Sequence, residues 1–303
     1  MPLNFLREIL GLKLLFRDML CPNCPMKLAL LITVPLLIGL PVQAQLAAPN
    51  AAGVTLGHIH LLAKDVDAER GFFIDMMGGT QVENDKISMI QLPGVFLVIT
   101  RGDPVVSSPG STLNHFGVVL KDVTAYSAKW DAHHVIIDHA ENPKAGYVHA
   151  PLGLRIEFYE DPSLSVPIAM NHVHFYTSPE KVPEIQAWYV NLFGGRASQR
   201  YCTSCLPVHR RLMQTVDIPG TNFSLGVLSQ ANSAATTVPS KGGPIDHIGL
   251  EVKNLKAFVE KAEANGTKFD ESYRVSTNSA RVHTAFLTDP WGTRIELTEG
   301  LTP

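Results

Sequence analysis

A histidine-led strand recurs four times along this 303-residue chain, and this repeat constrains the fold more than any other feature. Each copy begins with a small residue, continues with His, and then runs into apolar residues of strand-like composition. Such a repeat is one supersecondary unit that must pack against its neighbours to bury a core. The copies read GHIHLL from residue 57, NHFGVV from 114, NHVHFY from 171 and DHIGLE from 246.

The residues after each of these strands predict a helix and then about three short strands. The third helix has the clearest boundaries, because Ser178 and Pro179 suit its first turn and Gly194 its end. The expected helices cover residues 67–77, 123–133, 178–193 and 254–265. The last strand of each unit follows a glycine, at Gly94, Gly153, Gly220 and Gly292. The sequence therefore predicts an α+β fold of four βαβββ modules.

Alternate modules share details that their neighbours lack. Modules one and three carry His-x-His and a Gly-Gly pair after the helix, whereas modules two and four carry His-x-Gly and a Glu in the last strand. This alternation predicts two domains of two consecutive modules each, covering residues 54–161 and 170–300. Pro162 and Pro167 mark the connection between them, since proline-containing loops commonly separate compact units.

The first 44 residues predict an export signal. Lys27 precedes a 13-residue apolar run at residues 28–40, and the small residues that follow suit cleavage after Ala44. Thirteen residues are too few for a membrane-spanning helix, which needs about 20. We therefore expect a periplasmic or secreted protein with no membrane association after cleavage. The alternatives are an uncleaved anchor and a true start at Met26.

Charge and cysteine content restrict partners and redox chemistry. The formal net charge of −3 is small and evenly spread, so the chain lacks the basic stripe that duplex nucleic-acid binders need. Cys202 and Cys205 form a C-x-x-C motif, which in an oxidising compartment predicts a small disulfide loop or idle thiols. A redox motif is the alternative, although no helix N-terminus is expected beside it.

The leading histidines and the last-strand glutamates are candidate metal ligands. Side chains two residues apart on a strand face the same way, so paired modules can direct them into one curved trough. Two imidazoles and one carboxylate hold a divalent transition metal and leave positions open for substrate. The alternative is that each is an ordinary strand residue. The expected sets are His58, His115 and Glu157 in the first domain and His172, His247 and Glu296 in the second.

Further residues are expected on the same faces. His60 and His174 lie two residues after a leading His, and we interpret them as candidate acid–base groups, alternative ligands or packing residues. Arg155 and Arg294 precede the glutamates by two residues. They would orient the carboxylate, bind an anionic substrate or form a cross-strand ion pair.

Two aligned positions distinguish the modules further. Tyr147 comes ten residues before its glutamate and is a candidate catalytic proton donor, whereas Phe286 takes that place in the last module. Val98 and Ser224 stand in the first and third modules where the other two carry Glu. A site with two carboxylates is therefore disfavoured.

These motifs resemble those of the vicinal oxygen chelate superfamily, which includes glyoxalase-type lyases, fosfomycin- and bleomycin-resistance proteins, methylmalonyl-CoA epimerases and extradiol dioxygenases. The resemblance spans about residues 54–300 and implies βαβββ modules paired into two metal-centred domains. It rests on Asp289-Pro290-Trp291-Gly292-x3-Glu296-Leu297, its second copy Ala150-Pro151-Leu152-Gly153-x3-Glu157-Phe158, and the Gly-Gly helix ends after Phe72-Phe73 and Trp188-Tyr189.

The resemblance implies a divalent-metal-dependent enzyme, a lyase, isomerase, transferase or dioxygenase, acting on a small oxygen-bearing substrate. The metal would be Fe, Mn, Zn or Ni. The missing second carboxylate argues against a lactoylglutathione lyase, and Phe286 in place of a tyrosine argues against extradiol ring cleavage. The alternative is a metal-free binding protein of the bleomycin-resistance type. The resemblance leaves the substrate and the oligomeric state open.

Overall fold

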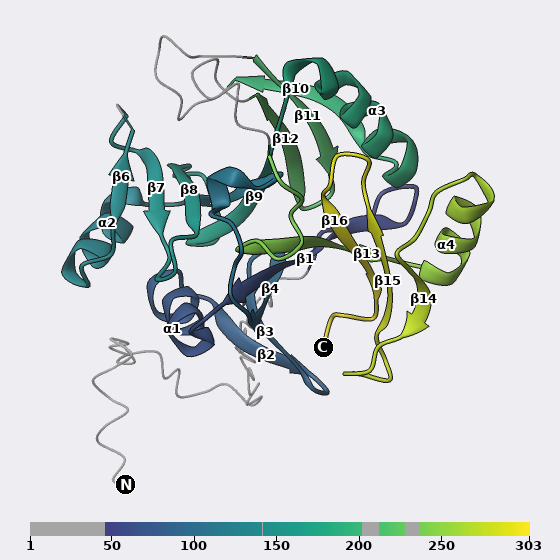
Figure 1. The fold of residues 1–303 in the computed structure, drawn as a ribbon. Helices are drawn as coiled ribbons and strands as arrows, with labels where there is room; N and C mark the ends of the chain where they lie inside the picture. The colour runs from purple at the N-terminus through teal and green to yellow at the C-terminus, as the bar shows by residue number, and fades with distance from the viewer. Residues whose placement is uncertain (1–45, 141, 202–211, 228–236) are drawn as a thin grey trace, which may run out of the picture. The chain divides into compact units, whose positions relative to one another are not determined.

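The computed structural model describes residues 46–140, 142–201, 212–227 and 237–303, and these described residues form one compact unit (Figure 1). The predicted export signal, residues 1–44, and the Cys202–Cys205 motif lie outside the described residues. No helix among the described residues is long and apolar enough to cross a membrane.

Every module has the predicted order of strand, helix and three strands, so the α+β prediction is confirmed. The first contains β1 (Val54–Ala63), α1 (Val66–Gly71), the π-helical η1 (Phe72–Met76), β2 (Thr80–Asn84), β3 (Ile87–Leu92) and β4 (Val95–Arg101). A 3-10 turn, η2 (Ser108–Gly110), precedes the second, which contains β5 (Leu113–Leu120), α2 (Val123–Ala132), β6 (Ile137–His139), β7 (Ala145–His149) and β8 (Arg155–Glu160).

The second half repeats this order. The third module contains β9 (Ile168–Thr177), η3 (Pro179–Lys181), α3 (Val182–Phe193), β10 (Arg196–Tyr201), β11 (Leu212–Ile218) and β12 (Thr221–Val227). The fourth contains β13 (Ile245–Val252), α4 (Leu255–Ala264), β14 (Glu271–Val275), β15 (His283–Thr288) and β16 (Arg294–Glu299).

Local residue chemistry explains where helices begin and last strands start. Asp65, Asp122 and Asn254 cap α1, α2 and α4, because each side chain accepts a hydrogen bond from the backbone N–H three residues later. The turn before each last strand needs a left-handed residue, which glycine adopts at the lowest cost. The φ angles of the four turn glycines are 90° at Gly94, 82° at Gly153, 87° at Gly220 and 96° at Gly292.

The modules form two eight-stranded mixed sheets, and each sheet joins one module from each expected domain. β1 of the first module pairs antiparallel with β13 of the fourth, and β5 of the second pairs antiparallel with β9 of the third. The expectation that modules pair within residues 54–161 and within residues 170–300 is therefore wrong for the sheets. The strand orders are β14-β15-β16-β13-β1-β4-β3-β2 and β10-β11-β12-β9-β5-β8-β7-β6.

Packing on the helix side explains this exchange in the first half of the chain. Phe73 of η1 packs on Phe116 of β5, with ring centroids 6.3 Å apart. The Trp130 indole on α2 donates a hydrogen bond to the Met76 carbonyl at 3.3 Å. The first two modules therefore contact each other through their helices, and their leading strands pair with the other half of the chain.

The second half packs in the same way. The Tyr189 hydroxyl on α3 donates to Asp289 Oδ2 of the fourth module at 2.9 Å, and Phe193 stacks on Phe258 of α4. Asp289 also accepts from the backbone N–H groups of Trp291 and Thr293, which explains the Asp-Pro-Trp-Gly motif as a structural turn.

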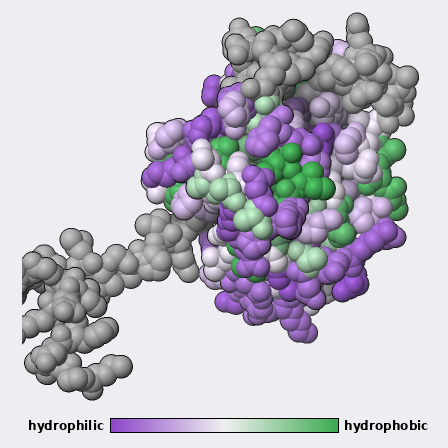
Figure 2. All heavy atoms as spheres, turned by 90° about the vertical axis from the view of Figure 1, so that its left-hand side faces the viewer, coloured by the Kyte–Doolittle hydropathy of each residue, from purple (hydrophilic) through white to green (hydrophobic). Residues whose placement is uncertain are grey.

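Large hydrophobic side chains are mostly enclosed between sheets and helices. The face that bears α1 and α2 in Figure 1 is largely hydrophilic around a small hydrophobic patch (Figure 2). Among the described residues, the exposed large hydrophobic side chains are Val105, Ile136, Leu152, Leu212, Val238 and Val275.

Candidate metal centres

Each sheet gathers three histidines and one glutamate at its central strands. In each group, one ligand atom from every residue lies within 4.8 Å of the others, which is close enough to hold one ion. We call the group on the first sheet the Glu296 cluster and the group on the second the Glu157 cluster. The Glu296 cluster contains His58, His60, His247 and Glu296. The Glu157 cluster contains His115, Glu157, His172 and His174.

All the predicted ligands are brought into such groups, but their grouping differs from the prediction. His58 joins His247 and Glu296 rather than His115 and Glu157, and His172 joins the latter two. The cause is the sheet pairing, because β1 lies beside β13 and β9 lies beside β5.

Glycines in the even modules make room for the histidines of the odd modules. Gly249 pairs with His58, and a Cβ there would come within 2.0 Å of the His58 ring. Gly117 pairs with His172, and a Cβ there would lie 2.1 Å from that ring. The alternation of His-x-His and His-x-Gly was thus the sequence signal for packing an odd module on an even one. The alternation did not predict which even module each odd module packs on, because pairing with either even module satisfies it.

The Glu157 carboxylate is the centre of its cluster. Its Oε2 lies 3.2 Å from His115 Nε2 and 2.9 Å from His172 Nε2. His174 Nδ1 lies 3.2 Å from His115 Nε2. All four side chains are buried, with His115 and His172 fully enclosed.

Hydrogen bonds beside the Glu157 cluster fix the position of the His115 proton. Arg155 donates to Asn114 Oδ1 at 3.1 Å, and because a guanidinium only donates, this oxygen is an acceptor. His115 Nδ1, 2.6 Å from the same oxygen, must then donate its proton to it. His172 Nδ1 makes the corresponding contact with Asn171 Oδ1 at 3.1 Å. The His115 ring therefore presents the lone pair of Nε2 to the Glu157 carboxylate, and the contact of His172 Nδ1 with Asn171 allows the same tautomer.

The pKa shifts agree with neutral rings around an ionised carboxylate. Burial lowers the pKa of His115, and Arg155 and Arg200 lower it further, against the opposing effect of Glu157. Burial likewise lowers the pKa of His172, to about 4. Burial raises the pKa of Glu157, but its contacts with His115 and His172 more than reverse this effect.

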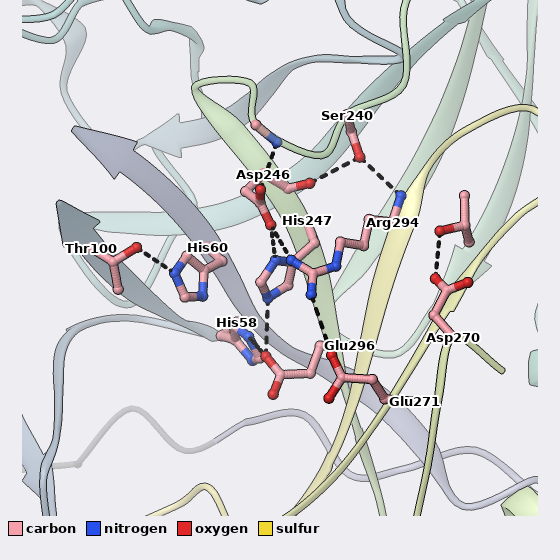
Figure 3. A network of polar contacts seen from close by, with 12 residues as sticks. His58, His60, Thr100, Ser240, Asp246, His247, Asp270, Glu271, Arg294 and Glu296 are labelled. Carbon is pink, nitrogen blue, oxygen red and sulfur yellow. Dashed lines mark hydrogen bonds and ion pairs between the residues drawn. The ribbon is translucent and has the colours of Figure 1, made fainter. Parts of the chain in front are cut away.

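The Glu296 cluster repeats the ligand geometry with a different set of neighbours (Figure 3). Glu296 Oε2 lies 3.0 Å from both His58 Nε2 and His247 Nε2. The His247 Nδ1 proton goes to Asp246 Oδ1 at 2.5 Å, and Arg294 donates to the same oxygen at 2.9 Å. A carboxylate thus stands where the other cluster has the Asn114 amide.

This extra carboxylate changes the protonation of the Glu296 cluster. Burial lowers the pKa of His247, but its hydrogen bonds to Asp246 and Glu296 outweigh burial and raise it overall. The pKa of Asp246 is raised by burial and lowered more strongly by His247, so its net shift is downward. Arg294 also approaches Glu271 at 4.0 Å, as in the predicted cross-strand ion pair.

His60 and His174 lie within the ligand groups, although their chemical roles remain predictions. His60 Nε2 bonds to Thr100 Oγ1 at 2.9 Å, and its ring lies 4.4 Å from that of His247. His174 stacks on Tyr176 with ring centroids 5.2 Å apart, and Gly226 gives it room, since a Cβ there would meet its Nε2 at 2.2 Å. Both histidines therefore face the clusters and are available as a fourth ligand.

Tyr147 lies beside the Glu157 cluster, as its alignment predicted. It pairs with Glu157 across β7 and β8, and its ring lies 5.3 Å from that of His115. Phe286 pairs with Glu296 in the same way. Burial and the nearby Glu157 charge raise the pKa of the Tyr147 hydroxyl, so it keeps its proton at neutral pH.

The residues that support the ligands were not among the predicted site residues. Asn114 and Asp246 each stand directly before a leading His, so the signal was the small polar residue of the repeated motif. Arg200 donates from Nε to Ser224 Oγ at 3.0 Å, and Ser224 is fully buried. Arg200 had no sequence signal, because it reaches the cluster from the edge strand β10.

The donor sets fit a divalent metal ion. Neutral imidazole nitrogens and a carboxylate are the ligands that such ions take, and hydrogen bonds to the other ring nitrogen orient them. In the Glu157 cluster, Nε2 of His115 and Nε2 of His172 face one ionised carboxylate oxygen, an arrangement that a shared cation stabilises. The same side chains converge in the Glu296 cluster.

Comparisons with known proteins agree with this architecture. The family model described as Glyoxalase/Bleomycin resistance protein/Dioxygenase superfamily matches residues 147–297. The chain therefore belongs to this superfamily, as the motifs predicted.

Solved structures share the fold over most of the chain. Glyoxalase I from Zea mays is 13% identical with a TM-score of 0.60, and the match covers 82% of this chain and 92% of that one. A putative dioxygenase from Bacillus subtilis is 12% identical with a TM-score of 0.54, covering 82% and 86% of the two chains. At these identities the likeness is one of fold. No curated protein matches the chain.

Proposed function

We propose that this protein is a divalent-metal-dependent enzyme that acts on a small substrate with adjacent oxygen atoms. The observation that carries the proposal is the convergence of Nε2 of His115 and Nε2 of His172 on the Glu157 carboxylate, with the tautomer of His115 fixed by Asn114 and Arg155. The Glu296 cluster repeats the ligand set. A packing role alone would not require lone pairs to face a carboxylate in a buried site.

In the proposed reaction, His115, His172 and Glu157 hold the metal, with His174 beside them. The metal, when bound, acts as a Lewis acid that stabilises negative charge on a substrate oxygen. Tyr147 lies on the same face and keeps its proton at neutral pH, so it serves as the proton donor. The buried surroundings exclude water and strengthen these electrostatic interactions.

We place the chemistry at the Glu157 cluster and assign metal binding alone to the Glu296 cluster. Tyr147 offers a hydroxyl at the first, whereas Phe286 at the aligned position of the second offers none. Arg294, Asp246 and Glu271 already satisfy one another beside the Glu296 cluster. The Glu157 cluster therefore has both the proton donor and the less saturated surroundings.

Elemental analysis of anaerobically purified and loaded protein tests the proposal. We expect about two ions of Fe, Mn, Zn or Ni per chain, and about one in either Glu157→Gln or Glu296→Gln, because each removes the charged ligand of one cluster. Gln keeps the size of the side chain, so each variant is the folding control of the other. A chain that binds no stoichiometric metal after loading would contradict the proposal and favour metal-free binding.

A further inference from the structure

The two arginines that precede the glutamates have opposite electrostatic surroundings. Arg294 donates to the Asp246 carboxylate at 2.9 Å and approaches Glu271 at 4.0 Å. Arg155, at the aligned position, donates to the neutral Asn114 amide at 3.1 Å, and its buried Nε has no hydrogen-bond partner. Within the described part of the chain, no ion pair joins Arg155 to a carboxylate. The positive charge of Arg155 is therefore not neutralised locally as that of Arg294 is.

A second guanidinium reaches the Glu157 cluster from the opposite end of the sheet. Arg200 on β10 donates to the buried hydroxyl of Ser224, which is register-paired with His174. The contact uses the neutral Ser224 rather than an acid, and no ion pair of Arg200 joins it to a carboxylate among the described residues. At the aligned place of the other sheet, Val98 pairs with His60 and carries no charge or hydrogen-bonding group.

The charge balance near the two clusters therefore differs in sign. Among the described residues around the Glu157 cluster, Arg155 and Arg200 stand against the single carboxylate of Glu157. Around the Glu296 cluster, Arg294 stands against Asp246, Glu271 and Glu296 itself. Partly buried charges without local partners are costly, and a bound counter-ion lowers that cost. A positive site of this kind also concentrates anions from solution.

We propose that the Glu157 cluster takes an anionic substrate, whose carboxylate or phosphoryl group is held by Arg155 and Arg200. Tyr147, whose ring lies 4.9 Å beneath the Arg155 guanidinium, would line the same site. The inference rests on the proposed function, because it names the class of substrate for that site. It predicts that the Glu296 cluster, surrounded by carboxylates, binds such anions more weakly.

Isothermal titration of the full, metal-loaded chain with oxalate and, separately, with inorganic phosphate tests this inference. Oxalate represents a carboxylate-bearing substrate and phosphate a phosphoryl-bearing one, so the tighter probe identifies the anionic group. Arg200→Gln is expected to weaken that binding about tenfold or more, as loss of a hydrogen bond to a charged group does. Arg200→Lys keeps the charge and should weaken it by less than about threefold.

The same strand supplies a matched control. Arg196 also lies on β10 but forms a surface ion pair with Asp217, so Arg196→Gln should leave anion affinity unchanged. Asn114→Asp is a second test, because it gives Arg155 the partner that Arg294 has and should lower anion affinity. Oxalate and phosphate binding to Arg200→Gln as tight as to the unmodified chain would overturn the inference. The inference would also be overturned if the unmodified chain bound neither oxalate nor phosphate.

Metal content measured on the same samples separates the two proposals. If anion binding depends on Arg200 but the chain takes up no metal, the result contradicts the proposed function and supports the inference. If the chain holds its metal but its anion affinity is the same with and without Arg200, the result contradicts the inference alone.

Discussion

The Glu157 and Glu296 clusters have the same ligands in the same positions but different surroundings. In each cluster, Oε2 of the glutamate lies 2.9–3.2 Å from Nε2 of two histidines on neighbouring strands. Beside the first, the neighbours are an amide, a phenol and a serine hydroxyl. Beside the second, they are a carboxylate, a phenyl ring and an aliphatic side chain. The repeated fold fixes ligand geometry, whereas single residues next to the ligands determine charge and protonation.

This contrast separates what the scaffold supplies from what each site adds. Register and glycine placement supply the ligand geometry, so they should matter equally at both clusters. The residue before the leading His sets the charge of the hydrogen-bonded ring, so its substitution should matter in a direction that depends on the cluster.

Adding a methyl group beneath one histidine should produce the largest effect. In Gly117→Ala the new Cβ would meet the His172 ring at 2.1 Å, so the ring must leave its place and the Glu157 cluster should lose about a hundredfold in metal affinity. Gly249→Ala should do the same to the Glu296 cluster through His58. Metal titration followed by elemental analysis measures each.

Gly71→Ala provides the control for both variants. Gly71 is helical and its Cβ would meet only Asp75 Oδ2 at 3.9 Å, so metal affinity should stay unchanged. A Gly117→Ala protein that kept both metal ions at unmodified affinity would contradict the expectation that Gly117 and Gly249 play the same part at their two clusters.

Exchanging the residue before the leading His should have a smaller effect. Asp246→Asn removes the charge that raises the basicity of His247, so metal affinity of the Glu296 cluster should fall about tenfold. The Glu157 cluster of the same protein is the internal reference. A calorimetric titration that resolves the two sites checks this, and an unchanged affinity at the Glu296 cluster would show that the carboxylate does not distinguish the sites.

The smallest expected effect comes from a difference between two helices that pack on the sheets, α1 and α3. Glu69 on α1 is buried at the place where α3 has Ile185. Burial raises the pKa of Glu69 to about 7, so the folded chain retains a proton that the unfolded chain releases near 4.5. The retained proton stabilises the folded chain fully below pH 4.5, and this stabilisation is lost as the pH rises through 7. Stability should therefore fall by about 1 kcal/mol between pH 6 and pH 8.

Chemical denaturation at several pH values measures this dependence. Glu69→Gln should remove that part of the slope, whereas Asp67→Asn on the exposed side of α1 should keep it. A Glu69→Gln protein with the unmodified slope would show that this buried carboxylate titrates normally in the folded chain.

The sequence was sufficient for the modules and the ligands because their signals are local. A leading His, a turn glycine and a last-strand Glu each act within one module, and all appear where expected. The partner of each module depends on contacts between distant elements, such as Trp130 with Met76 and Tyr189 with Asp289. No short pattern encodes these contacts. Arg200 was missed for the same reason, since only the sheet brings its edge strand toward His115.

The exchange of partners between the two sheets means that neither half of this chain holds a complete ligand set. A half of two modules would carry one odd and one even leading strand, each with its pairing edge exposed. Two such halves could complete both sites only by meeting around a twofold axis, at a cost in entropy that depends on concentration. The connection at residues 161–167 makes that encounter intramolecular, so the continuous chain has the pseudo-symmetry of a dimer without its sensitivity to dilution.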